Sequence, residues 1–249
     1  MTEGQWNLVQ EFKTNFKKKC DEWSCFAEDL SDLQLKIIAQ NVQQYSLENP
    51  VVYNRFLDDV TKDDEIKLIV IGDNPGMDEQ KEKNCRYLVG QSGKIATSFF
   101  AKHEELGIDF RKNVLILNKT PLHTPKTKDL LVLQKEGSEN LKKLLRDSQV
   151  WMAQETLKFF KQFNECALNN KTELWLVGYS ELKKKGVFLP YKEAFLKECG
   201  GNMENIFVFQ HFSMNCFAID LKKHFDEKKT VKENLHCLGQ MHCKEIFEC

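Results

Sequence analysis

The sequence has no long apolar run and little net charge, and each absence excludes a class of protein. No stretch approaches the roughly 18 apolar residues that a membrane-spanning helix needs. The first residues, MTEGQWNLVQEF, do not have the basic-then-apolar layout of a signal peptide. The formal net charge is −1, so composition alone does not indicate a nucleic-acid or membrane partner. We therefore expect a cytoplasmic protein with no membrane partner.

The sequence also lacks a cysteine motif that would hold a metal. Nine cysteines are present, but none forms the C-x2-C pair that is typical of zinc sites. Cytosolic thiols are kept reduced, so a disulfide framework is not expected. Only two groupings have ligand potential: Cys20 with Cys25, and the tail LHCLGQMHCKEIFEC. Ordinary buried or surface thiols are the favoured interpretation, and we predict neither a metal nor a cofactor.

What is present is organised around residues 66–100. Residues 66–71 are apolar except for Lys67, and turn-forming residues follow from Gly72 onward. A short apolar run that ends in turn residues is typical of a strand buried on both faces. The polar loop 73–79 then leads towards a helical pattern. This order of strand, polar loop and helix places functional groups at the carboxyl edge of a parallel sheet.

The remaining elements follow from the spacing of apolar residues. Helical periodicity predicts helices over residues 6–23, 34–45, 51–60, 92–106 and 141–168, the last as one helix or two. Short apolar runs predict three more strands, at residues 113–117, 173–177 and 205–209. Parallel crossovers need covering helices, so these elements predict a three-layer α/β/α sandwich around a central four-stranded parallel sheet.

The length and the apolar share of the chain predict one domain. The 249 residues are 41% apolar, which suffices for one substantial core. Residues 1–60 would form a helical lead-in and residues 66–220 the core. The pattern of residues 229–249 does not define a structure for the tail.

Polar residues follow three of the predicted strands, as Asp73-Asn74, Asn118 and His211. The ends of parallel strands lie on one edge, so these residues are expected to converge on a single crevice. Taken singly, an Asp or Asn after a strand is about as often a turn or a helix cap. The joint pattern predicts a site without naming a reaction.

Two blocks of the sequence resemble the uracil-DNA glycosylase superfamily. GDNPGMDE (residues 72–79) and YLVGQSGK (residues 87–94) are similar to the G-E-x-P-G-x-x-E and P-F-V-G-x-[AS]-G-x-L-L blocks of its bacterial and archaeal branch. Residues 114–118 resemble the second strand of that family with its asparagine. His211-Phe212-Ser213 resembles a divergent form of the H-P-S motif. The resemblance covers about residues 66–220. It implies the fold of that superfamily and hydrolysis of the N-glycosidic bond of uracil or another deaminated base in DNA.

The resemblance also implies roles for individual residues. Asn74 would position the attacking water, Asn118 would read the edge of the base, and His211 would donate a hydrogen bond as negative charge builds on the base. Because extruding a nucleotide costs a few kcal/mol, single-stranded or mismatched DNA is the expected partner. The predicted site residues are Asn74, His211 and Asp73 for catalysis; Asn118, Tyr87, Leu88 and Glu79 for the base; and Gly72, Gly76, Gly90, Ser92 and Ser213 for close approach of the nucleotide backbone.

The sequence departs from the family at several of these positions. Leu88 stands where the family has an aromatic residue that stacks on the base, although Tyr87 is adjacent, and Phe212 replaces the proline of H-P-S. Leu122 stands where the branch carries a cysteine of its iron–sulfur cluster, and no cysteine lies between Cys85 and Cys166. We therefore expect no cluster.

Two interpretations of the function remain open. The intact set Asn74, Asn118 and His211 favours an enzyme, whereas Leu88 and the altered H-F-S loop favour a module that binds a nucleotide, a nucleic acid or a protein without efficient catalysis. Local lysine clusters could supply the phosphate contacts that DNA binding requires. The candidates are Lys119, Lys126 and Lys128 after the second strand, and Lys183, Lys184 and Lys185 after the third.

Overall fold

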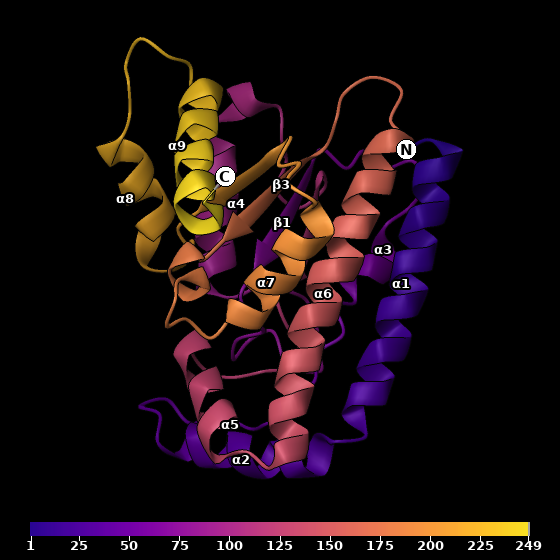
Figure 1. Cartoon of the computed structure of the whole chain (residues 1–249), viewed down its shortest axis with the longest axis vertical. Coiled ribbons are helices and arrows are strands. Elements are labelled where there is room, and N and C mark those ends of the chain that lie inside the picture. Colours follow the sequence, from indigo (N-terminus) through magenta and orange to yellow (C-terminus); the bar gives the residue numbers. More distant parts are fainter. Residues whose placement is uncertain (249) are drawn as a thin grey trace.

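Four short apolar segments form one parallel β-sheet in the computed structural model, which describes residues 1–248 (Figure 1). The strands are β1 (Leu68–Gly72), β2 (Val114–Asn118), β3 (Glu173–Val177) and β4 (Ile206–Phe209), in the order β2-β1-β3-β4. All neighbouring pairs are parallel. The four predicted strands and their parallel arrangement are confirmed.

Helices cover both faces of this sheet. Figure 1 shows α6 (Glu139–Glu165) and α7 (Leu189–Cys199) on one side, and α4 (Gln91–Lys102) and α9 (Val231–Phe247) on the other. Helix α8 (Cys216–Lys223) belongs to the second group. This covering explains why nearly every strand residue is buried and apolar, since a strand covered on both faces has no side for water.

Aromatic side chains fix the helices of the second group to the sheet. The ring of Trp175 in β3 stacks on Phe100 of α4 at 5.7 Å and on Phe217 of α8 at 6.0 Å. Gly239 brings α9 against Phe207 of β4, where a Cβ atom would lie 2.7 Å from the Phe207 Cβ. Close packing of α9 on the edge strand therefore requires this glycine.

The N-terminal residues form helices that pack outside the sheet layers. Helix α1 (Glu3–Ser24) begins with a capping box between Thr2 and Gln5. Its Phe16 stacks on Trp151 of α6 at 5.9 Å. Helix α2 (Ala27–Ala39) begins seven residues before the start of the predicted helix 34–45 and ends six residues before its end. Only the first half of that prediction is therefore right.

The helix predicted over residues 51–60 is wrong except for the short α3 (Phe56–Asp59). Val51 instead forms an antiparallel bridge with Leu122. The Asn54 side chain donates to the carbonyl of Ile116 at 2.8 Å. These long-range contacts hold residues 51–54 against the β2 strand and its loop, and they override the local helical spacing.

The other helices complete the layers. Residues 139–165 form one helix rather than two, and the tail, whose structure the pattern did not define, forms α9 with a capping box between Thr230 and Glu233. The remaining elements are α5 (Leu130–Glu136) and short 3-10 turns at Glu104–Leu106, Thr127–Asp129, Tyr179–Leu182 and Ser213–Asn215. Among residues 1–248, no helix is both long enough and apolar enough to span a bilayer.

Candidate functional site

The predicted strand-end residues lie at one edge of the sheet. In the strand register, Gly72 of β1 lies beside Asn118 of β2, and Val177 of β3 lies beside Phe209 of β4. The residues that follow these positions, including Asp73 and His211, therefore leave the sheet at the same carboxyl edge. This edge is the candidate functional site.

A buried ion pair occupies the centre of the edge. The Lys119 side chain is fully buried, and its Nζ lies 2.6 Å from Asp73 Oδ1. Nζ also donates to the carbonyl oxygens of Val177 at 2.6 Å and Gly72 at 3.3 Å. The other Asp73 oxygen accepts a hydrogen bond from Thr127 Oγ1 at 3.1 Å. One lysine therefore joins the ends of β1, β2 and β3.

This position corrects the prediction for Lys119, which cannot belong to a phosphate-binding surface patch. Burial lowers the pKa of the Lys119 ammonium group, while the adjacent Asp73 carboxylate acts in the opposite direction. The two other lysines of that cluster, Lys126 and Lys128, are exposed. Nothing in the local sequence distinguishes Lys119 from them, because its burial follows from the neighbouring strand ends.

Gly178 makes room for the Asp73 carboxylate. It has φ +87°, and a Cβ atom there would lie 2.3 Å from Asp73 Oδ1. Both the backbone conformation and the close approach therefore require glycine.

His211 is held in one tautomer by the turn that follows it. The backbone N–H of Ser213 donates to His211 Nδ1 at 3.0 Å, and the Ser213 hydroxyl lies 2.9 Å from the same atom. Because Nδ1 accepts a hydrogen bond, the proton of the neutral ring is on Nε2. Burial lowers the pKa of His211, the Lys119 charge adds to this, and Asp73 opposes it. His211 is thus a neutral donor whose Nε2–H has no hydrogen-bond partner among residues 1–248.

Asn118 carries a buried amide group that the protein does not satisfy. The residue is only 2% exposed, and its Nδ2 has no hydrogen-bond partner among the described residues. Its Oδ1 lies so close to Gly72 that a Cβ atom on Gly72 would be 2.5 Å away. An unsatisfied buried donor costs about 1–3 kcal/mol, so this amide is a strong candidate for contact with a ligand.

Asn74 is oriented by the loop that follows β2. Its Nδ2 donates to Thr124 Oγ1 at 2.9 Å and lies 3.4 Å from the carbonyl oxygen of Leu122. Its Oδ1 accepts no hydrogen bond from the described residues. The nitrogen is therefore bound to protein, and the oxygen is the group left for a water or a ligand.

Glu79 holds the two sequence blocks together. Its buried carboxylate accepts a hydrogen bond from the backbone N–H of Gly76 at 3.1 Å, and the backbone N–H groups of Leu88 and Val89 also bond to it. Burial raises the pKa of Glu79 to about 7, against the effect of these hydrogen bonds. The structure thus places this residue within the loop framework.

Tyr87 and Leu88, predicted to contact the base, are both buried. Tyr87 is 2% exposed, and its hydroxyl group donates to the carbonyl oxygen of Val52 at 2.6 Å. Leu88 is 4% exposed, and its carbonyl oxygen accepts a hydrogen bond from Arg111 at 2.7 Å. Neither side chain has a free face on which an extruded base could stack.

Gly76 and Gly90 lie in the segment between β1 and α4, whereas Gly72 and Gly93 of the same blocks are buried. A Cβ atom on Gly76 would meet nothing within 4 Å, and one on Gly90 would meet only Asp78, at 3.8 Å. Packing within the protein therefore does not require glycine at these two positions. Gly90 is also the N-cap of α4, and Ser92 lies in the first turn of that helix.

The loop after His211 exposes one side chain and buries another. Phe212 is fully buried, with its ring centroid 4.9 Å from that of Phe217. Met214 is 85% exposed. Met214 and Asn215 both have positive φ, 53° and 58°, and this turn leads directly into α8.

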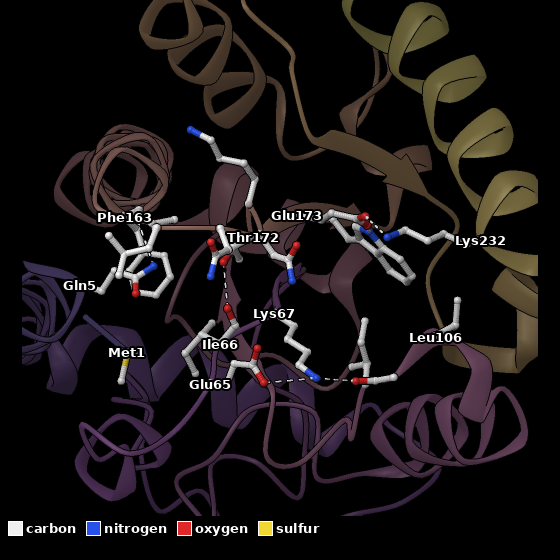
Figure 2. A pocket seen from close by; sticks show the side chains of 18 of the residues that line it. Met1, Gln5, Glu65, Ile66, Lys67, Leu106, Phe163, Thr172, Glu173 and Lys232 are labelled. Carbon is white, nitrogen blue, oxygen red and sulfur yellow. Dashed lines mark hydrogen bonds and ion pairs between the residues drawn. The ribbon is translucent and has the colours of Figure 1, made fainter. Parts of the chain in front are cut away.

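The crevice expected around Asn74, Asn118 and His211 is not among five cavities measured on residues 1–248. A cavity of about 470 Å³ is located at the opposite, amino edge of the sheet, next to Lys67 and Glu173 (Figure 2). Two ion pairs lie in its lining, Lys67 with Glu65 at 3.3 Å and Glu173 with His236 at 2.8 Å.

The comparisons with known proteins do not assign the chain to a family. Neither a protein-family model nor a curated protein matches it. Within residues 1–248, no three His, Cys, Asp or Glu side chains are grouped as ligands for a metal ion. The strand-end residues are therefore the features from which a function can be inferred.

Proposed function

We propose that the chain is a monofunctional DNA glycosylase with a uracil-DNA glycosylase-like fold, which releases uracil or another deaminated base from single-stranded or mismatched DNA. The observation that carries the proposal is the fixed tautomer of His211, since the Ser213 backbone N–H at Nδ1 leaves Nε2–H as a neutral donor. The sequence resemblance assigns this position to the histidine that bonds the leaving base.

The reaction needs groups that stabilise charge as the N-glycosidic bond breaks. The bonding electrons leave with the base, so the base becomes anionic and the sugar cationic. His211 Nε2–H and Asn118 Nδ2–H would donate to the base, where they stabilise charge that develops only in the transition state. Asn74 Oδ1 would orient the water, whose hydroxyl adds to the sugar carbon and whose proton goes to the released base.

In this proposal Asp73 is a positioning residue. Its two carboxylate oxygens are bound by Lys119 and Thr127, so neither is left free to activate water. Glu79 likewise positions the loop between the two blocks rather than contacting the base.

One observation favours the alternative, a binding module without efficient catalysis. Tyr87 and Leu88 are both buried, so the first two blocks present no ring to stack on an extruded base. A module would bind a nucleotide, a nucleic acid or a protein at the same edge without releasing a base.

The test is base release from labelled single- and double-stranded oligonucleotides that contain uracil, hypoxanthine or xanthine, followed by alkaline cleavage. An enzyme gives strand scission, and His211→Ala lowers the rate about 10²–10³-fold, as expected for the loss of one donor. Asn74→Ala lowers the rate as well. The control is His236→Ala at the amino edge, which leaves the rate unchanged. Salt-dependent binding of DNA by the wild-type protein without any abasic product would instead support the module.

A further inference from the structure

A groove of about 600 Å³ runs between α4 and α8 and begins beside the candidate site. Its lining includes Phe99 and Lys102 of α4, Leu221 and Lys222 of α8, and Phe225. We call it the α4–α8 groove. The two helices are labelled in Figure 1.

Both walls of the groove start at the carboxyl edge of the sheet. Helix α4 follows directly after Gly90, its N-cap in the second sequence block. Helix α8 begins at Cys216, five residues after His211, and Asn215 of the intervening turn lines the groove itself. Helix α4 also packs against the turn Ser213–Asn215, so this end of the groove lies next to the loop that follows His211.

The exposed charges on the two helices are all positive. Helix α4, QSGKIATSFFAK, has no acidic residue, and its Lys94 and Lys102 are exposed. The one acid of α8, Asp220, is turned towards His224 and His242, whereas Lys222 and Lys223 are exposed. None of these four lysines has an ion-pair partner among residues 1–248.

This concentration of charge stands out because the whole chain has a net charge of −1. Glu227 is the one carboxylate among the residues that line the groove, and His103 on the opposite wall is paired with Glu105. The rim is therefore complementary to an anionic occupant.

The floor of the groove is apolar and carries an exposed aromatic ring. Phe225 is 41% exposed, although large apolar side chains are mostly buried in this protein. Lysines that can neutralise phosphates, together with a ring on which a base can stack, are the combination that binds single-stranded nucleic acid without sequence preference.

We propose that the α4–α8 groove binds the single-stranded DNA that flanks the extruded nucleotide. Lys102 and Lys222 contact its phosphates, and Phe225 stacks on one of its bases. This inference rests on the proposed function, because continuity with the catalytic edge selects DNA over an acidic peptide as the occupant.

The test measures binding of the full-length protein to a short oligodeoxythymidine by fluorescence anisotropy at several salt concentrations. Each lost phosphate contact lowers the slope of log K against log salt by about 0.7, so Lys102→Ala/Lys222→Ala lowers it by about 1.4. Phe225→Ala weakens binding about fivefold or more through lost stacking. The control, Lys18→Ala/Lys158→Ala, removes two exposed lysines from α1 and α6 and leaves both quantities unchanged. Thermal unfolding verifies that all variants are folded.

The outcomes separate this inference from the proposed function. A double variant with the wild-type salt slope overturns the groove as a DNA site, whether or not the protein releases a base. If the double variant loses binding to an acidic amphipathic peptide but binds DNA as the wild-type protein does, the groove is a site for a protein and the inference is overturned. A reduced slope in a protein that releases no base supports the groove and refutes only the enzyme. If the wild-type protein releases a base, the groove variants release it at the same single-turnover rate when the protein is saturating, because the groove contributes to binding and not to the chemical step.

Discussion

Replacement of Lys119 by methionine tests whether the buried ion pair holds the strand ends together. The variant keeps a long apolar side chain but removes the cation from Asp73, whose carboxylate is almost fully buried. Removing one partner of a buried pair typically costs about 3–5 kcal/mol, because the other charge stays buried without compensation. For a chain of this length, each kcal/mol corresponds to roughly 2–4 °C in Tm. We therefore expect Tm to fall by roughly 6–20 °C.

The double variant Asp73→Asn/Lys119→Met isolates the cause. With both charges removed, no unpaired charge remains in the interior, and we expect the double variant to regain about 2 kcal/mol relative to Lys119→Met alone. The carbonyl oxygens of Val177 and Gly72 still lose their donor, so recovery stays incomplete. Urea unfolding followed by circular dichroism measures each free energy of unfolding.

The matched control is Lys128→Met, an exposed lysine nine residues further along the chain. It should change the free energy of unfolding by less than about 0.5 kcal/mol. Two results would refute a buried and coupled pair. One is a Lys119→Met variant whose free energy of unfolding falls by less than about 1 kcal/mol. The other is a double variant that is destabilised by as much as the two single variants, Asp73→Asn and Lys119→Met, added together.

Three further variants test other parts of the structure by urea unfolding. Burial lowers the pKa of His123 from 6.5 to about 4, so its contribution to stability is complete above pH 6.5. About 3 kcal/mol of it is lost as the pH falls to 4, and a His123→Asn variant should lack that component. Gly93→Ala should lose about 3 kcal/mol or more, since its Cβ atom would lie 1.5 Å from the Leu88 carbonyl oxygen; wild-type stability would contradict this contact. Gly239→Ala should destabilise by about 1–3 kcal/mol through its clash with Phe207, although alanine normally favours a helix; a stabilised variant would disprove the packing of α9.

The sequence by itself determined the strands and the edge to which they lead. Each strand is a short apolar run that ends in turn residues, a local signal that does not depend on distant contacts. Once the strands are parallel, the chain direction alone brings Asn118 and His211 to one edge. For the same reason, the strand-end residues could be named before the structure was known.

Only the tertiary structure decided how the groups at that edge are bonded. The sequence does not specify the strand order β2-β1-β3-β4, and it is this order that brings the Val177 carbonyl within reach of Lys119. Burial of Tyr87 and the non-helical path of residues 51–54 likewise depend on partners far away in the chain. Local propensities amount to less than about 1 kcal/mol per residue for most residues, so contacts between distant segments outweigh them. The sequence therefore predicts where polar groups emerge, and packing determines which of them remain free to meet a ligand.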